Sequence, residues 1–288
     1  MKRSPILILV ATLAVVTMAC GITINLPKEE LMTTEMQTED ISIPKPDSSS
    51  INLTLAFGAG ELSLSSGNEN ALVSGTATYN VKDLKPEIDV NGGDVRLSTG
   101  NLEIKGIPRI RGDFKNIWDL QLSSTPMNLK INAGAYQGRF ELGGLALQTL
   151  DISDGASDVQ LNFSEPNMVE MDNLRYTTGA SQIDLRGLGN ANFTTMNFRS
   201  GAGNYSLDFS GQLNRNATVN IESGISQVII TVPEGTNTKL NFKGGLSNVD
   251  TSGGWEKSGD QYQIIGNGPT LTIFVDMGAG NLELRTNQ

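Results

Sequence analysis

The chain has 288 residues and contains no histidine. No side chain therefore has an ordinary pKa near neutrality, which excludes a Ser-His-Asp triad, a Cys-His pair and a histidine-ligated zinc site. Cysteine occurs once, as Cys20, so no disulfide can form within the chain. These absences argue against an enzyme, and we predict no cofactor and no metal site.

Aromatic residues are also scarce, at 6%, and basic residues are in the minority: 21 lysines and arginines against 31 aspartates and glutamates give a formal net charge of -10. An acidic surface repels phosphate backbones, so we expect no nucleic-acid partner. Beyond the leader, no stretch of eleven or more residues has the apolar period of a helix. Glycine is abundant instead, at 32 residues against 10 prolines, which is typical of many defined turns.

The first twenty residues are predicted to be an export signal. Lys2 and Arg3 precede an apolar run over residues 6–16, which ends in Thr17-Met18-Ala19-Cys20. A basic start, an apolar segment and a small residue before the cleavage point are typical of a secretory signal peptide. The alternative is an uncleaved signal anchor, because residues 6–24 are roughly long enough to span a bilayer.

The position of the single cysteine resembles the bacterial lipobox. That resemblance implies that Cys20 becomes the first mature residue and carries lipid; Ala19 fits the pattern, whereas Thr17 and Met18 depart from it. With either leader, we expect the protein outside the cytoplasmic membrane and tied to it at the N-terminus. Residues 21–50 are polar and acidic, and we predict a disordered tether that reaches roughly 30 Å.

From residue 51 onward one unit recurs: a short alternating strand, a glycine with a small residue, and a second alternating strand. Eight copies centre on what we call the keystone glycines, Gly58, Gly134, Gly155, Gly179, Gly201, Gly224, Gly245 and Gly278. From Gly134 to Gly245 they are 21 to 24 residues apart, and an insertion containing Trp255 widens the last step to 33. A period of about 22 residues predicts stacked repeats.

Each unit has one apolar face. In residues 196–211 the alternation predicts this inward set: Met196, Phe198, Tyr205, Leu207 and Phe209. In residues 219–235 it predicts Val219, Ile221, Val228, Ile230 and Val232. One unit cannot bury such a face alone, whereas units stacked at about 4.8 Å bury a continuous core. We expect the keystone glycines to permit a left-handed backbone at each sharp turn.

The predicted fold is all-β: a right-handed parallel β-solenoid over residues 128–288, with a stack of antiparallel hairpins as the alternative. The steady period without Asn-Gly turns favours the solenoid. Residues 51–127 largely break the pattern, and we interpret them as an irregular N-terminal β domain or cap that protects one end of the stack.

The motifs Gly58-Ala59-Gly60 and Gly278-Ala279-Gly280, behind a lipoprotein-like leader, resemble the bacterial toast-rack family and adhesin-like domains with repeated Gly-Ala-Gly units. Two copies depart from the motif, at Gly224-Ile225-Ser226 and Gly245-Leu246-Ser247. The resemblance covers roughly residues 50–288. It implies a β-solenoid on the cell surface and supplies no catalytic residues.

The densest acidic cluster is Asp151, Asp154 and Asp158, which could form a carboxylate pair or a calcium site but reads more simply as acids at a turn. Trp118 and Trp255 are possible ligand contacts, since an indole can stack on a sugar ring. The expected function is a non-catalytic, lipid-anchored surface protein, adhesin-like or envelope-sensing, whose partner is an envelope glycan or protein. The alternative is a carbohydrate-active β-helix enzyme that uses paired carboxylates.

Overall fold

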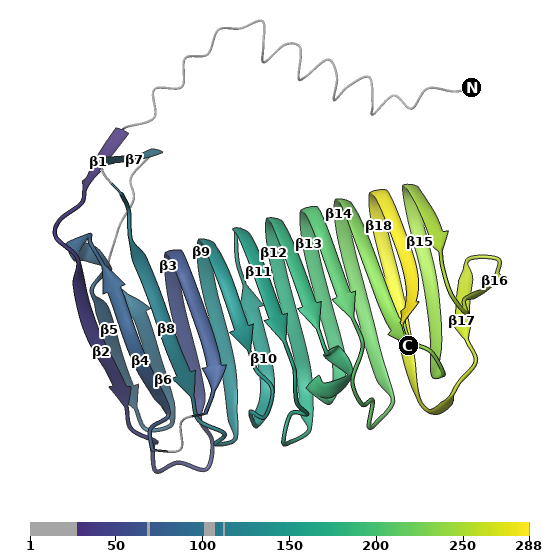
Figure 1. Ribbon diagram of the computed structural model, residues 1–288, viewed down its shortest axis with the longest axis horizontal. Coiled ribbons are helices and arrows are strands. Elements are labelled where there is room, and N and C mark those ends of the chain that lie inside the picture. The colour runs from purple at the N-terminus through teal and green to yellow at the C-terminus, as the bar shows by residue number, and fades with distance from the viewer. Residues whose placement is uncertain (1–27, 68–69, 101–106, 112, 288) are drawn as a thin grey trace, which may run out of the picture.

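The computed structural model describes residues 28–67, 70–100, 107–111 and 113–287, so Cys20 and the leader lie outside the described residues. The described chain consists almost wholly of β-strands (Figure 1), which confirms the all-β prediction. The strands are β1 (Lys28–Met32), β2 (Gln37–Ile43), β3 (Asn52–Ser66), β4 (Val73–Tyr79), β5 (Pro86–Asn91), β6 (Asp94–Thr99), β7 (Ile107–Arg111), β8 (Asn116–Leu122), β9 (Met127–Glu141), β10 (Leu147–Ser153), β11 (Ala156–Asn162), β12 (Met171–Arg186), β13 (Phe193–Asp208), β14 (Ala217–Pro233), β15 (Thr236–Thr251), β16 (Glu256–Ser258), β17 (Gln261–Ile264) and β18 (Asn267–Asn287). Two short 3-10 helices, η1 (Lys82–Leu84) and η2 (Leu188–Ala191), are the helical elements of these residues.

Sixteen strands form one sheet, while β1 and β7 form a separate parallel pair. The long strands lie side by side like the bars of a rack (Figure 1). We call each long strand a rung; in spatial order the rungs are β3, β9, the pair β10 and β11, β12, β13, β14, β18 and β15. Neighbouring rungs pair in parallel and in register: Leu174 lies opposite Met196, and Met196 lies opposite Val219.

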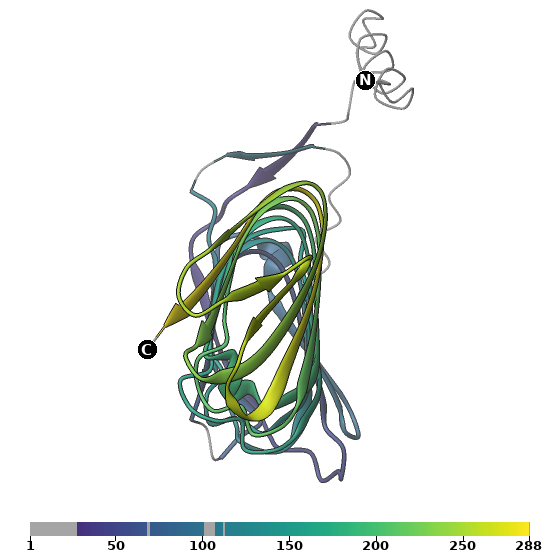
Figure 2. The same cartoon turned by 90° about the vertical axis from the view of Figure 1, so that its right-hand side faces the viewer.

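Each rung contributes to both sides of one core. In β13, Met196 and Phe198 are buried before the keystone glycine and Tyr205 and Leu207 are buried after it, so the alternation shifts by one residue at Gly201. A straight strand would turn one of these pairs outward, so the chain must bend there. Seen along the stack, the rungs superpose as an elongated oval (Figure 2). Both inward sets predicted from the alternation are buried.

The keystone glycines are required by close approach between rungs. None of the eight has a positive φ, so the expectation of a left-handed backbone at these positions is wrong. A Cβ at Gly179 would lie 2.4 Å from the carbonyl oxygen of Gly155 on the preceding rung, and one at Gly201 would lie 2.7 Å from that of Gly179. The positive φ occurs at the second glycine of the motif, as at Gly203 with φ 151°.

The last strand of the chain is not the last rung. β18 lies between β14 and β15 and pairs in parallel with both. The insertion after β15 forms the β16–β17 hairpin, and β17 pairs with β15 from Thr238 to Asn241. One half of β15 is therefore covered at this end of the stack (Figure 1).

At the other end, the stack begins with β3, which pairs in register with β9 (Leu53 opposite Leu129). Residues 52–66 thus continue the same sheet, although they belong to the segment interpreted as a cap. From β3 the sheet continues as β6 and β5 beside the first half of the strand, and as β8, β4 and β2 beside its second half.

Strand β2 corrects the prediction of a disordered tether over residues 21–50. Gln37 to Ile43 pairs antiparallel with β4, and the side chains of Ile41 and Ile43 are buried in the core. The acidic composition of the segment conceals this short alternation. Two isoleucines on the inner face supply the apolar burial that holds the strand in the sheet.

Candidate functional site

The two tryptophans predicted as ligand contacts lie in different surroundings. Trp118, on β8, is fully buried, and its ring meets Phe57 edge-on with the centroids 5.2 Å apart. It is a core residue and offers no face to a sugar. Trp255, just before β16, is half-buried and packs against the core at the β15 end of the stack. Cys20, the predicted lipidation site, lies outside the described residues.

The acidic cluster separates into individual contacts. Asp151 pairs with Arg175 at 3.0 Å, and Asp158 pairs with Arg139 at 3.2 Å. The carboxylate of Asp154 instead accepts hydrogen bonds from three hydroxyl groups, on Tyr136, Tyr176 and Thr178. Within the described ranges, no group of three or more acidic or cysteine side chains is arranged to hold a metal ion.

Asp154 marks the start of a polar line along the inner side of the bends. Thr178 and Ser181 share a hydrogen bond at 2.6 Å, and the same pattern recurs two rungs later between Ser223 and Ser226. Burial raises the pKa of Tyr136 and of Tyr176, and in both cases the nearby Asp154 carboxylate raises it further. These groups satisfy one another inside the molecule, so the line is structural.

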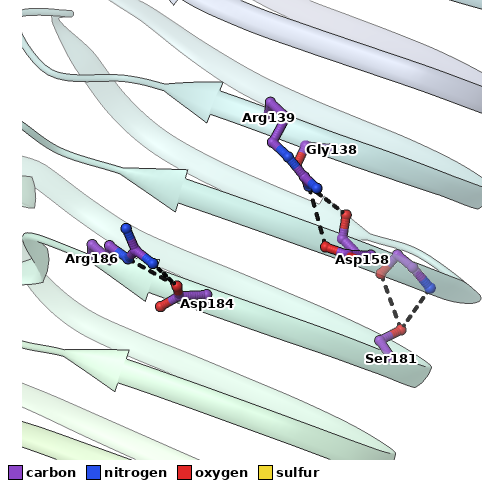
Figure 3. A network of polar contacts seen from close by, with 7 residues as sticks. Gly138, Arg139, Asp158, Ser181, Asp184 and Arg186 are labelled. Carbon is purple, nitrogen blue, oxygen red and sulfur yellow. Dashed lines mark hydrogen bonds and ion pairs between the residues drawn. The ribbon is translucent and has the colours of Figure 1, made fainter.

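The outer face of β9 to β12 is densely charged but internally paired (Figure 3). Arg139 reaches across to Asp158 on the next rung, while Arg186 binds Asp184 on its own strand at 2.8 Å. A shallow hollow of about 230 Å³ lies beside these residues and includes Glu141. Although partial burial raises the pKa of Glu141, donors from Ser164, Gly143 and Asn162 outweigh it and hold that pKa below its usual value. This face therefore lacks a free carboxylate pair of the kind a glycosidase uses.

The largest hollow, about 640 Å³, lies between the β5–β6 hairpin and the bends of β3 and β9. Small side chains and main chain form most of it, including Ala56, Gly58 and Ala133, with Glu87 and Arg96 at the hairpin side. These residues bring together neither a nucleophile with a base nor a set of metal ligands, so the hollow suggests no chemistry.

A groove on the outer face of β14, β18 and β15 has a different composition. Its volume is about 300 Å³, and the aromatic ring of Phe274 projects into it with 45% of the residue exposed. Asn220 on β14 and Asn241 on β15 lie directly opposite Phe274 on either side. Two positions further along, Glu222, Asp276 and Lys243 form a charged row; the complete lining is Asn220, Ile221, Glu222, Asn241, Phe242, Lys243, Phe274, Val275 and Asp276.

Phe274 interrupts a polar row that runs the length of the stack. The residues at the same outward position on the eight rungs, in spatial order, are Thr54, Lys130, Asp151, Arg175, Asn197, Asn220, Phe274 and Asn241. Sequence reasoning missed this residue. Its signal is present in the alternating strand over residues 271–277, where Phe274 occupies a position that the pattern reserves for a polar side chain.

The comparisons with known proteins concern fold and family. Residues 32–172 match the model of the N-terminal domain of toast_rack, which confirms the resemblance seen in the Gly-Ala-Gly motifs. Among curated proteins, none matches the chain. Among the helices of the described residues, none has the length and hydrophobicity needed to cross a membrane.

Solved structures also resemble the chain. A protein from Clostridium sporogenes, described as a candidate cell adhesion protein, is 20% identical with a TM-score of 0.50, covering 88% of this chain and 100% of its own. That likeness shows the fold alone. A candidate adhesin from Parabacteroides merdae (10% identity, TM-score 0.34, 89% and 99% covered) and a candidate lipid-binding protein from Parabacteroides distasonis (9%, 0.35, 88% and 99%) are more distant.

Proposed function

We propose that this chain, a member of the toast-rack family through residues 32–172, is a non-catalytic surface protein that displays its outer β faces to an envelope ligand. A lipid on Cys20 tethers it to the membrane. Its ligand is a glycan or a protein of the cell envelope, and the protein acts as an adhesin-like or envelope-sensing module.

The single observation that carries this proposal is the regularity of the outer faces. After the bend, one outward position holds an amide side chain on six of the eight rungs; the residues are Gln137, Gln182, Asn204, Gln227, Asn281 and Asn248, with Glu61 and Asp158 on the other two. Successive rungs repeat at about 4.8 Å, so these amides form a line of hydrogen-bonding groups along the stack. Such a line suits an extended, repetitive ligand.

We also infer that the rungs form a right-handed parallel solenoid with a repeat of about 22 residues. The in-register offsets support the repeat: Leu150 and Leu174 are 24 residues apart, and Leu174 and Met196 are 22 apart. The right-handed twist of strands, which makes crossover connections right-handed, favours that hand here as well.

The anchor is tested by comparing wild type with Cys20→Ser in a bacterium, by mass and by fractionation. We expect wild type to lose its leader, gain the mass of lipid and fractionate with membranes, and Cys20→Ser to do none of these. A Cys20→Ser protein that stays in membranes with its leader intact, unshifted from wild type, would identify a signal anchor instead.

The binding role is tested by sedimentation of the detergent-purified full chain with isolated bacterial envelopes. We expect saturable retention and no release of reducing sugar ends. The carbohydrate-active enzyme remains the second candidate, because Glu141, Asp184 and Asp208 lie on neighbouring rungs. Release of reducing ends would establish that candidate, and absence of retention would refute the binding role.

A further inference from the structure

An exposed phenylalanine is not by itself a site, because single apolar side chains are common on protein surfaces. Phe274 differs in its setting: it stands at the centre of a groove, on a rigid sheet, in a row that is polar at every other rung. Strands on both sides of β18 fix its position. An aromatic ring held in this way is a preorganised flat apolar surface.

The two flanking amides are each half used. The Nδ2 atom of Asn220 donates to Oδ1 of Asn197 at 3.1 Å, and Oδ1 of Asn241 accepts from Nε2 of Gln261 at 2.9 Å. Within the described residues this leaves Oδ1 of Asn220 as an acceptor on one side of Phe274 and Nδ2 of Asn241 as a donor on the other. At two strand spacings the amides are roughly 10 Å apart. Hydroxyl groups, which both donate and accept, match this pair of unused atoms.

The charges at the rim of the groove are already neutralised. Lys243 pairs with Asp276 at 2.8 Å, and Glu222 pairs with Arg199 of β13 at 3.2 Å. A charged ligand would have to compete with these ion pairs, whereas an uncharged one would not. The rim therefore favours a neutral ligand with many hydroxyl groups.

A peptide has no backbone to pair with in this groove. β18 is paired on both sides, and β17 occupies the outer edge of β15 from Thr238 to Asn241. Strand addition, the usual way in which a sheet captures an extended peptide, is thus closed at this position.

We propose that the groove centred on Phe274 binds a neutral glycan, with the C–H face of one pyranose ring stacked on the phenyl ring and its hydroxyl groups bonded to Asn220 and Asn241. The inference rests on the proposed surface-binding function and names its ligand class and its site. The polar rows on the neighbouring rungs then accommodate the adjoining sugars.

The test titrates the detergent-purified full chain with cellohexaose, chitohexaose and mannohexaose by isothermal calorimetry. Phe274→Thr restores a β-branched residue of the kind found at Thr54 in the same row, so strand propensity is retained. Losing the buried stacking area should weaken binding about tenfold to a hundredfold. Phe274→Trp should retain binding, and Ile225→Thr, at an exposed apolar side chain of the corner, is the matched control and should be unchanged. Thermal unfolding establishes that each variant is folded.

The outcomes separate this inference from the proposed function. Selective loss in Phe274→Thr supports the groove. Equal binding by Phe274→Thr and wild type overturns the groove as the site and leaves a glycan-binding surface elsewhere. If none of the three hexasaccharides binds while isolated envelopes still retain the protein, the glycan assignment fails and the surface role stands. If the envelopes also fail to retain it, both fail.

Discussion

Replacing a keystone glycine by alanine tests how the rungs pack. In Gly179→Ala the new methyl group would lie 2.4 Å from the carbonyl oxygen of Gly155, which must move away. That oxygen accepts hydrogen bonds from the backbone N–H groups of Gly179 at 3.1 Å and Ala180 at 3.0 Å. Overpacking costs about 1–3 kcal/mol, and weakening two hydrogen bonds adds up to about 1 kcal/mol each. We expect a total loss of about 2–4 kcal/mol in the free energy of unfolding.

Gly58→Ala is the matched control, because β3 has no preceding rung in this position. The nearest atom to its new Cβ is Oγ1 of Thr99 at 3.5 Å, an ordinary van der Waals distance. Stability should be unchanged or raised by up to about 1 kcal/mol, since alanine restricts the unfolded chain. Urea unfolding followed by circular dichroism measures both variants. If Gly58→Ala is as destabilising as Gly179→Ala, close approach between rungs is not what requires the glycine.

Three further predictions concern the core and its titrating groups. Trp118→Ala should lower the free energy of unfolding by about 3–5 kcal/mol, and the half-buried Trp255→Ala by clearly less; equal losses in thermal melts would contradict the burial of Trp118. Since the pKa of Glu141 is lowered on folding, its stabilising effect is present above about pH 4.3 and is lost as the pH falls through the lower folded pKa, so urea midpoints of wild type and Glu141→Gln should differ at pH 7 and converge near about pH 3. Because burial raises the pKa of Tyr136 and Tyr176, their contribution is full below about pH 10 and is lost at higher pH; an absorbance titration should find two of the five tyrosines un-ionised until the protein unfolds, and five equivalent tyrosines would refute the buried network.

The repeated part of the fold could be predicted from sequence because each unit repeats the same physical requirement. Alternating side chains identify the inner face of β13 and β14, and every keystone glycine marks a bend. The reason for the glycine could not be predicted: a close contact with the next rung depends on stacking, and a single unit contains no trace of it.

The order of the rungs was also beyond the sequence pattern. The step from Gly224 to Gly245 is 21 residues, as in true neighbours, yet Gly278 stacks between them in space. Sequence reasoning assumes that consecutive units are adjacent, which is usual but is not a physical law. Likewise, β2 has only Ile41 and Ile43 as inward residues, too few to stand out in an acidic segment.

The candidate site was missed for a related reason. Searching for chemistry favours rare residues, so Trp118 and Trp255 attracted notice while Phe274 was counted as part of an apolar strand. Its outward position becomes visible only when the seven other rungs are aligned beside it, and that alignment needs the register. The acids of the cluster, in turn, could not be assigned partners until Arg139 and Arg175 were placed on the neighbouring rungs.

The insertion of β18 between β14 and β15 has a consequence for the order in which the chain folds. Residues 236–251 are synthesised before residues 267–287, so the edge of β14 is complete while its final neighbour does not yet exist. In that interval β15 can pair with β14 at a 21-residue spacing that resembles every native step. Such a pairing is a trap that buries much of the same surface. The last twenty-one residues must then separate two strands that already fit, so the slow step of folding belongs to the C-terminus.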